Sequence, residues 1–373
     1  MFCDYFGICG SCTIFGVDYA SQLRQKVDEQ IASFRDLFDG HFEIFASETQ
    51  AFRARAEFKI YHDDFGICYA MNTKDKKFVT IQNCQIVNGQ ISQMMPKLIK
   101  SLQEDELLSR KLFGVEFLTS CDEVLVTLIY HKKLDDDWIA LAKKIQSDLN
   151  IKIIGRSRGQ KVVLSDDFVT QKIEIDKRQF AIIQKESGFS QPNSGVNSKM
   201  LSWVLKNISS SGDLCELYCG GGNFTIALST KFRKVLATEI SKTSIASAKQ
   251  SCILSGVENI EFLRMSSEDF TSALNKEREF FRLKDISLDD YDFSTIFIDP
   301  PRAGVDEKTL ELVARFENII YISCNPVTLK RDLEILNKTH KISRFAFFDQ
   351  FAWTHHIESG VILTKNLWAW NPN

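Results

Sequence analysis

The chain has 373 residues, a formal net charge of -3, 44% hydrophobic and 25% charged residues. These values are ordinary for a globular protein, and the length suits two domains. No apolar run approaches the ~18–20 residues of a membrane span. The first residues lack the basic start and apolar stretch of a signal peptide, so we expect a cytoplasmic protein without a membrane partner. The net charge neither favours nor excludes a nucleic-acid partner.

The ten cysteines are many for a chain in the reducing cytoplasm, where structural disulfides are rare. Cys3, Cys9 and Cys12 stand at the very start and Cys84 follows later, a spacing that favours a metal over disulfides. Four others lie in apolar or mixed stretches, and we expect small buried hydrophobic side chains there: Cys68, Cys121, Cys215 and Cys252.

The first half of the sequence predicts mixed helices and strands. An amphipathic helix is expected over 18–38. Residues 51–60, AFRARAEFKI, alternate between apolar and mostly basic positions, as in a half-buried strand. Further strands are expected at 78–87 and 123–131, helices at 91–104 and 136–149, and a basic segment at 151–161.

From about residue 200 onward, short apolar strands alternate with helical stretches, which is typical of a doubly wound α/β sheet with right-handed crossovers. Gln191-Pro192-Asn193 is the expected hinge. We therefore expect two domains, an α+β region over 1–190 and an α/β domain over 191–373.

A glycine-rich turn, Gly220-Gly221-Gly222, follows the first strand of the second half, and Glu239 ends the next strand. Glycines there let the backbone approach a ligand, and an acid at the second strand end can hold two ribose hydroxyls. The G-x-G-x-x-G spacing expected for a dinucleotide is missing. The pattern favours S-adenosylmethionine over NAD, with Ser267-Glu268-Asp269 near the adenine, although a plain glycine turn and a solvated acid remain the alternative.

Two more strand ends carry Asp299-Pro-Pro-Arg302 and Ser323-Cys324-Asn325-Pro326. Ligands of open α/β sheets bind beyond such ends. A thiolate there can add to carbon 6 of uracil, which makes carbon 5 able to attack a methyl donor. A base must then remove the carbon-5 proton, and Glu358 is the candidate, with His355 and His356 beside it. The alternative is a buried strand-end thiol, a solvated acid and ordinary loop histidines.

The motifs ELYCGGGNF, DPPRAG, YISCNP and FDQFAWTHHIE together resemble those of the RNA uracil-5 methyltransferases, most closely the TrmA-type branch that acts on tRNA. Segments of the first half, including FRARAEFKIYH, YHKKLDDDW and GFSQPN, resemble that branch as well. The resemblance implies a Rossmann-like methyltransferase sheet behind an N-terminal RNA-binding region. The implied substrate is the T-loop uridine of tRNA, converted to ribothymidine, with no obligate protein partner.

The resemblance also implies roles for particular residues. Cys324 would be the nucleophile and Glu358 the base. Five residues would contact S-adenosylmethionine or lie beside it: Gln191, Tyr218, Asn223, Glu239 and Asp299. The RNA contacts that we expect are Arg53, Arg55, Lys59, Phe113, His131 and Arg302, since bases of an opened T-loop need new stacking partners.

Two features depart from the tRNA branch. Ala352-Trp353 stands where the family usually shows proline and another aromatic residue. Cys3-x5-Cys9-x2-Cys12 with Cys84 resembles the iron–sulfur framework of the ribosomal branch, which implies a [4Fe–4S] cluster held by four thiolates. Zinc, unliganded cysteines, and Cys68 as a rival fourth ligand stay open.

The cysteines favour a second enzyme hypothesis, a uracil-5 methyltransferase of 23S ribosomal RNA. The absence of room for an N-terminal barrel before Cys3 and the Thr354-His355-His356 segment favour tRNA. A hypothesis of another class is a tRNA-folding chaperone whose catalysis is dispensable.

Overall fold

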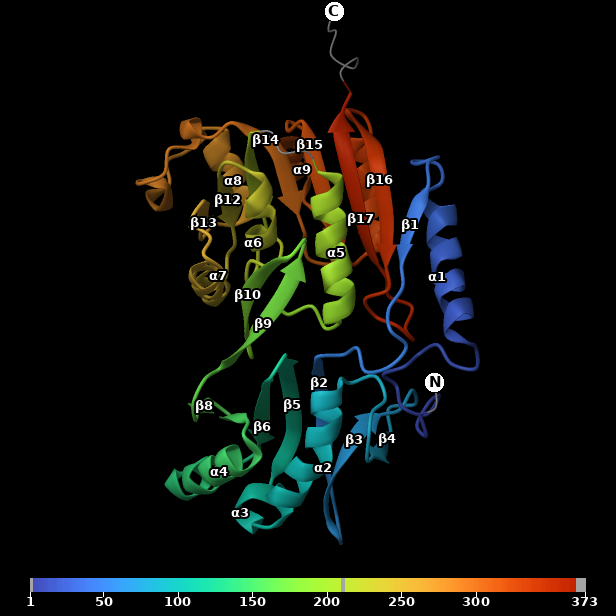
Figure 1. Cartoon of the computed structure of the whole chain (residues 1–373), viewed down its shortest axis with the longest axis vertical. Coiled ribbons are helices and arrows are strands. Elements are labelled where there is room, and N and C mark those ends of the chain that lie inside the picture. Colours follow the sequence, from blue (N-terminus) through green and yellow to red (C-terminus); the bar gives the residue numbers. More distant parts are fainter. Residues whose placement is uncertain (1–2, 209–211, 367–373) are drawn as a thin grey trace, which may run out of the picture.

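The computed structural model describes residues 3–208 and 212–366. Two sheets are stacked along the long axis of the molecule (Figure 1). The C-terminal sheet has eight strands in the order β1-β16-β17-β15-β14-β11-β12-β13. Their bounds are β1 Phe42–Phe45, β11 Asp213–Leu217, β12 Val235–Thr238, β13 Ile260–Leu263, β14 Phe293–Ile298, β15 Asn318–Ser323, β16 His340–Phe348 and β17 Glu358–Lys365.

Helices flank the C-terminal sheet, as expected for crossovers between parallel strands. Both of its faces are buried: every residue of β11 is inaccessible to solvent. The flanking helices are α1 Tyr19–Phe34, α5 Ser194–Asn207, α6 Thr225–Leu228, α7 Lys242–Ser255, α8 Ser267–Leu274, α9 Glu307–Val313 and α10 Pro326–Leu336, with 3-10 turns at Ser229–Lys231, Phe281–Leu283 and Leu288–Asp290. This arrangement confirms the expected α/β fold class.

The N-terminal segment contributes to the C-terminal sheet. β1 pairs in parallel with β16. Phe34 of α1 and Phe42 of β1 lie against Phe345 with ring centroids 4.9 and 5.0 Å apart. The helix expected over 18–38 is present and ends at Phe34. A strand as short as β1, far from its partner in sequence, had no signal that could assign it to this sheet.

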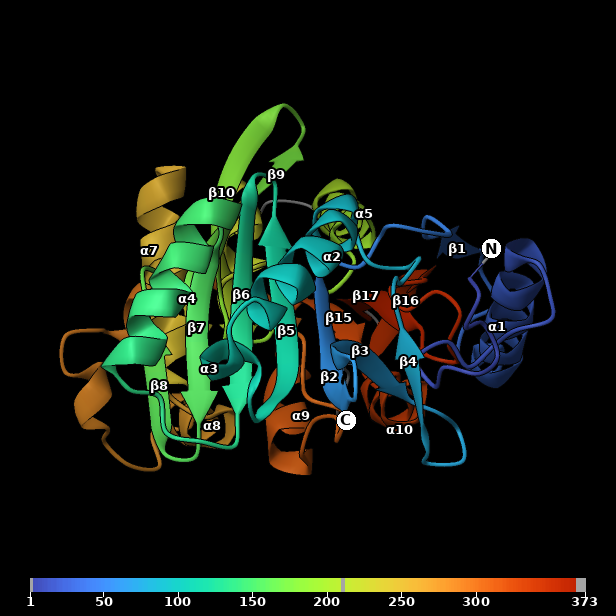
Figure 2. The same cartoon turned by 90° about the horizontal axis from the view of Figure 1, so that it is seen from below.

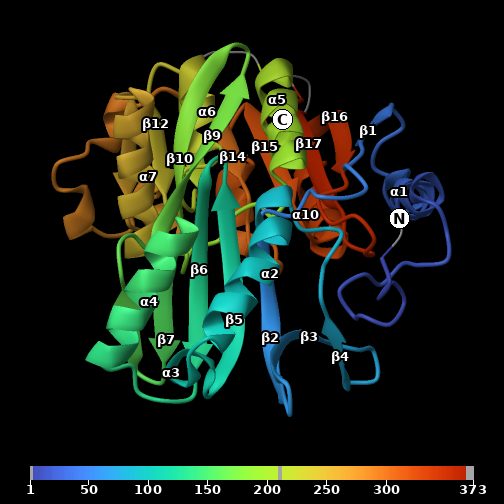
Figure 3. The same cartoon turned by 60° about the horizontal axis from the view of Figure 1, so that its bottom comes forward.

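The N-terminal sheet has seven strands in the order β4-β3-β2-β5-β6-β7-β8. α2 and α4 cover one of its faces (Figures 2 and 3), and Leu98 and Trp138 from these helices join its core. The bounds are β2 Arg55–Asp63, β3 Gly66–Asn72, β4 Phe78–Ile81, α2 Gly89–Gln103, α3 Glu106–Ser109, β5 Leu112–Ser120, β6 Glu123–Tyr130, α4 Asp136–Leu149, β7 Lys152–Ser157 and β8 Gln160–Val163. A separate antiparallel ribbon, β9 Phe168–Ile175 and β10 Arg178–Lys185, follows this sheet in the chain.

Most elements expected in the first half are confirmed, and three details are wrong. β2 alternates as expected, with Ala56, Phe58 and Ile60 buried. The strand expected over 78–87 ends at Ile81, so Cys84 lies in the loop before α2 and not in a strand. Cys215 and Cys252 are buried as expected, but Cys121 is exposed and Cys68 only half-buried, because both lie at or near tight hairpin turns.

Gly155 gives a test of the N-terminal core. A Cβ atom there would come within 2.4 Å of the Trp138 ring and 2.6 Å of Leu134. We expect Gly155→Ala to reduce the stability by about 1–3 kcal/mol, because an overfilled core must shift its side chains or backbone. Thermal unfolding should show a lower Tm. Gly89→Ala is the control, since nothing lies within 4 Å of its Cβ position; equal Tm values for both variants would contradict the packing described here.

Candidate active site

The candidate active site lies where the parallel strands of the C-terminal sheet end. β11, β12, β14 and β15 are mutually parallel, so their carboxyl ends meet at one edge. This edge faces the N-terminal sheet (Figure 1). The residues that directly follow these strands are Tyr218, Glu239, Asp299 and Cys324. The structure therefore brings together four of the side chains singled out in the sequence.

The glycine-rich turn after β11 is tied to the acid after β12. The Gly220 N–H donates to Glu239 Oε2 at 3.0 Å, and the Ser241 N–H donates to Oε1 at 2.7 Å. Gly222 has φ +85°, and a Cβ there would come within 3.2 Å of Ala248. A side chain at position 222 is thus disfavoured twice, and the turn stays thin enough for close approach of a ligand to the backbone.

Other expected cofactor residues surround this turn. Tyr218 has a left-handed φ of 62°, and its hydroxyl donates to Ser267 Oγ at 2.8 Å. Asn223 exchanges two amide hydrogen bonds with Asn197 of α5, at 2.8 and 2.9 Å. Gln191 is buried in the segment leading to α5. These contacts orient an amide, an acid and a phenol around one turn, which suits a ribose and an amino-acid moiety better than a diphosphate.

Cys324 and Glu358 become neighbours through strand pairing. Ser323 at the end of β15 pairs with Ser359 of the antiparallel strand β17. The next residues along each strand in that register are Cys324 and Glu358. Glu358 is 4% exposed, and Cys324 is half-buried. The Cys324 thiol and the Glu358 carboxyl group therefore lie side by side, and Asp299 lies at the end of the neighbouring strand β14. These three side chains form the floor of the site.

Burial changes the ionisation of the three side chains that form this floor. Burial, followed by the charge of Asp299, raises the pKa of Glu358 to about 8, and burial raises the pKa of Asp299 to about 7. Burial and the charges of Glu358 and Asp299 also raise the pKa of the Cys324 thiol. Arg302 acts in the opposite direction: its guanidinium lowers the pKa of both Cys324 and Glu358.

Arg302 lies at the entrance to this floor. Its Nη2 lies 3.3 Å from Nδ1 of His356, and its carbonyl accepts a 2.8 Å hydrogen bond from the Asn325 amide. A cavity of 610 Å³ opens here, which is large enough for a nucleobase together with parts of its neighbours. Its lining includes Cys324, Arg302, His355, His356, Lys330 and Arg331.

The expected RNA contacts of the first half lie in different surroundings. Phe113 is 46% exposed and stacks on His131 with ring centroids 4.4 Å apart. The Lys59 ammonium donates to Asn72 Oδ1 at 2.9 Å on the exposed side of β2. Arg55 donates to the carbonyls of Glu186 and Gly188 at 2.7 and 2.6 Å. Phe113 and His131 thus form a paired ring surface, whereas Arg55 is already engaged.

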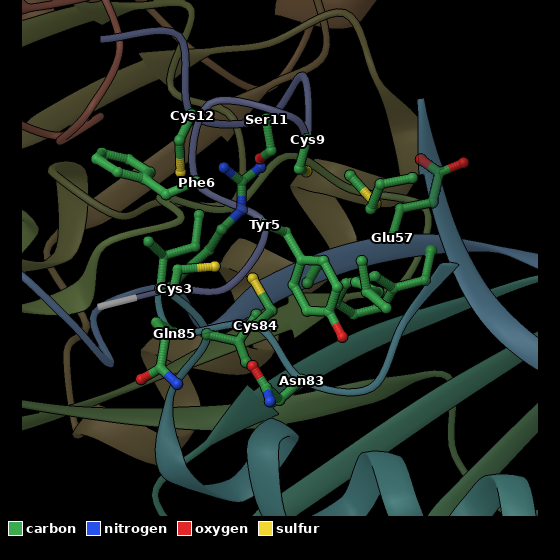
Figure 4. Close-up of a pocket in the computed structure, with 17 residues that line it drawn as sticks. Cys3, Tyr5, Phe6, Cys9, Ser11, Cys12, Glu57, Asn83, Cys84 and Gln85 are labelled. Carbon is green, nitrogen blue, oxygen red and sulfur yellow. The ribbon is translucent and has the colours of Figure 1, made fainter. Parts of the chain in front are cut away.

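Arg53 and the four N-terminal cysteines line one cavity of 260 Å³. Figure 4 shows the sulfur atoms of Cys3 and Cys84 turned toward one another across it. Burial lowers the pKa of the Arg53 guanidinium, against the opposing charges of Cys84 and Cys12. Within residues 3–208 and 212–366, no three His, Cys, Asp or Glu side chains stand close enough together to hold a single metal ion.

Two residues near the edge were not assigned from sequence. Glu216, the fourth residue of β11, is buried, its Oε2 has no hydrogen-bond partner in the described part of the chain, and burial raises its pKa to about 8. Its position inside the quoted motif was a usable signal. Lys26 is 3% exposed and contacts Asp349 at 2.5 Å. Nothing in the polar sequence around Lys26 indicated that it would be buried.

Taken with the fold, the glycine turn, the acid after β12 and the thiol after β15 place the chain among the Rossmann-like methyltransferases. Its fold matches that of the Pyrococcus abyssi tRNA (uracil-54, C5)-methyltransferase, solved in complex with S-adenosyl-L-homocysteine, with a TM-score of 0.72 over 96% of this chain and 86% of that one, at 20% identity. Among the described residues, no helix is long and apolar enough to cross a membrane.

The sequence comparisons define the family. The family model described as tRNA (Uracil-5-)-methyltransferase matches residues 18–366. A tRNA/tmRNA (uracil-C(5))-methyltransferase of Aliarcobacter butzleri is 56% identical over 98% of this chain and 99% of its own length. The Sulfurovum protein of the same name is 51% identical over 98% and 100%. The chain belongs to the tRNA (uracil-5-)-methyltransferase family.

The raised pKa values predict a pH dependence. Glu358 is largely protonated at neutral pH and becomes a carboxylate as the pH rises through about 8, and Cys324 ionises in the same direction. If the reaction uses both ionised forms, kcat/KM should rise between about pH 6 and pH 9. Arg302→Gln should move this rise to higher pH, because Arg302 lowers both pKa values. A kcat/KM that stays flat or falls as the pH rises would contradict a role for the ionised forms of Glu358 and Cys324. A pH profile that is the same in Arg302→Gln as in wild type would contradict it as well.

Proposed function

We propose that this chain transfers a methyl group from S-adenosylmethionine to carbon 5 of the T-loop uridine of tRNA. The observation that carries the proposal is the register of β15 and β17, which sets a thiol and a carboxyl group side by side at the edge that holds the glycine turn. Family membership supports the substrate class, and the names of the relatives extend it to tmRNA.

In the mechanism that we propose, the Cys324 thiolate forms a bond to carbon 6 of the uracil. The electron pair moves onto the ring, and carbon 5 takes up the methyl group. S-adenosylmethionine, when bound, supplies that methyl group. Glu358, as a carboxylate, then accepts the proton from carbon 5, and the bond between Cys324 and carbon 6 breaks. Arg302 stabilises the negative charge that develops during the addition.

The cofactor would lie along the turn after β11. Glu239, whose carboxylate accepts from the Gly220 and Ser241 N–H groups, would also accept hydrogen bonds from ribose hydroxyls. Tyr218, Asn223 and Gln191 would contact its remaining parts. Asp299 would lie between the cofactor and the uracil, because it follows β14, the strand between β11 and β15.

We also propose how the chain divides this work. Residues 191–373 would form the methyltransferase domain, and residues 1–190 an RNA-binding region whose α1 and β1 lie against the partner sheet. Stacking of an unpaired base on the Phe113–His131 pair could contribute about 1–3 kcal/mol. We propose a cytoplasmic location, which fits this function.

We propose further that the cavity between Cys3, Cys9, Cys12 and Cys84 takes a [4Fe–4S] cluster. Thiolates are the usual ligands of such clusters, and four are needed. Zinc is the alternative, because four thiolates also suit a closed tetrahedral site around one ion. Its role would be structural, since the methylation described above moves no electrons to or from a metal.

The catalytic roles predict distinct failures. With an unmodified tRNA transcript, Cys324→Ala should form no 5-methyluridine while keeping its affinity for S-adenosylhomocysteine, because the thiol contacts RNA and not the cofactor. Glu358→Gln should accumulate a covalent enzyme–RNA adduct, visible on a denaturing gel, because elimination waits for proton removal. Substantial turnover by Cys324→Ala would refute the mechanism. Product in a 23S ribosomal RNA transcript but not in tRNA would instead favour the ribosomal hypothesis.

The cluster predicts a composition. Protein purified without oxygen should be brown and contain iron and acid-labile sulfide, and Cys84→Ser should lose much of both. Cys68→Ser is the matched control and should retain them, because Cys68 does not line the cavity. Colourless anaerobic protein with neither iron nor zinc would rule the site out, and zinc without sulfide would establish the alternative.

A further inference from the structure

The loop that leads to Glu358 is bound by the buried ammonium group of Lys26. This loop, residues 349–357, joins β16 to β17 and includes His355 and His356. Lys26 of α1 is 3% exposed, and Asp349, the first residue of the loop, is fully buried. The two side chains form a 2.5 Å ion pair across 323 residues of sequence.

The contacts of Lys26 match the donors of a charged ammonium. Its Nζ donates to Asp349 Oδ1 at 2.5 Å, to the Phe351 carbonyl at 3.2 Å and to the His356 carbonyl at 3.1 Å. An ammonium has three N–H donors, and here each has an acceptor. All three acceptors belong to the same loop, so Lys26 ties two residues at its beginning and one near its end to one point.

The second oxygen of Asp349 extends this attachment. Oδ2 accepts from the Tyr19 hydroxyl at 2.8 Å and from the Gln22 amide at 3.3 Å. Tyr19, Gln22 and Lys26 are spaced by three and four residues, so they lie on one face of α1. One helical face therefore grips the loop through five hydrogen bonds.

The gripped loop carries the groups next to the reaction centre. His356, whose carbonyl binds Lys26, has its ring nitrogen 3.3 Å from Arg302, and Glu358 follows two residues later. A buried ion pair is weak evidence for stability, because an apolar pair of similar volume can serve as well. A donor that is satisfied only when three loop positions meet at one point is, however, well suited to fixing a geometry.

We propose that Lys26 is a positioning residue, which fixes loop 349–357 so that Glu358 can reach the proton on carbon 5 of the bound uridine. This inference rests on the proposed function. Other contacts would keep the loop in place without Lys26: the Thr13 and Ile14 N–H groups donate to the Trp353 carbonyl, and the Trp353 indole donates to the Thr49 carbonyl, at 2.9–3.0 Å. Removal of the ammonium should therefore displace the loop slightly and not unfold it.

The test is Lys26→Met, which keeps most of the volume and removes the three donors. We expect kcat to fall by roughly tenfold to 100-fold, as for a small misplacement of a catalytic group. S-adenosylhomocysteine affinity should stay within about twofold of wild type. The covalent enzyme–tRNA adduct should accumulate as in Glu358→Gln, since Cys324 still adds to carbon 6 while proton removal is slowed. Adduct accumulation separates positioning from a general loss of stability.

Arg233→Met is the matched control. Arg233 pairs with Asp213, another fully buried carboxylate, at the opposite end of β11 from the site. This variant should lower the Tm without adduct. Lys26→Met with wild-type kcat, or with reduced kcat and no more adduct than Arg233→Met, would overturn the inference.

Two further comparisons complete the design. If Lys26→Met does not fold, Asp349→Asn keeps the shape of the pair, and we expect the same adduct; its absence would equally overturn the inference. Wild type and Glu358→Gln, assayed in parallel, distinguish a failure of the positioning role from a failure of the proposed function. A Glu358→Gln adduct without one in the Lys26 and Asp349 variants refutes the positioning role alone, whereas a wild type that makes no 5-methyluridine refutes the proposed function and this inference with it.

Discussion

The pairing of β17 with β15 is the contact on which the reaction centre depends. Parallel strands bring only their carboxyl ends to a shared edge. Glu358 is the first residue of its strand, so it reaches that edge only because β17 runs the opposite way. β16, which precedes β17 in the chain, is antiparallel to it and therefore runs in the same direction as β15. Its last residue, Phe348, lies opposite Glu358. The hairpin loop between these two strands therefore lies at the same edge, and its His355 and His356 line the cavity with Cys324.

Burial at the site disfavours the ionised forms of its acidic side chains. Two carboxyl groups and a thiol lie at one floor, and each has a raised pKa. Arg302 is the cation that lowers two of these values. In the proposed mechanism, the Arg302 guanidinium offsets negative charge on Cys324, on Glu358 or on the uracil ring in turn.

Much of this arrangement could be predicted from the sequence, because it follows from local patterns. Short apolar strands that end in Gly220, Asp299 and Cys324 predict both the α/β sheet and the edge at which these residues meet. Contacts between distant segments could not be predicted in this way. Lys26 lies on a polar helix and gave no sign of burial. Arg53 lines the cavity of the cysteines and pairs through its backbone with Val87, in the loop after β4, which ends earlier than its apolar pattern suggested.

The departure at Ala352-Trp353 has a structural explanation. Both residues are buried, and they share a small apolar cluster with Cys12, Phe52 and Ile86. Trp353 also meets Phe6 edge-on, with ring centroids 5.3 Å apart. The unusual residues of the loop before Glu358 therefore lie against the unusual cysteine segment at the start of the chain. The two departures from the tRNA branch are two sides of one contact.

The attachment of β1 to β16 has a consequence for the order of synthesis. Phe42 pairs with Phe345, about 300 residues further along the chain. At roughly 5–20 residues per second, the ribosome needs about 15–60 s to make that partner. During this interval α1 and β1 have left the ribosome without β16, the strand that covers them. The newborn chain thus exposes the apolar side chains of Phe34 and Phe42, both buried in the folded protein, until its last strands are made.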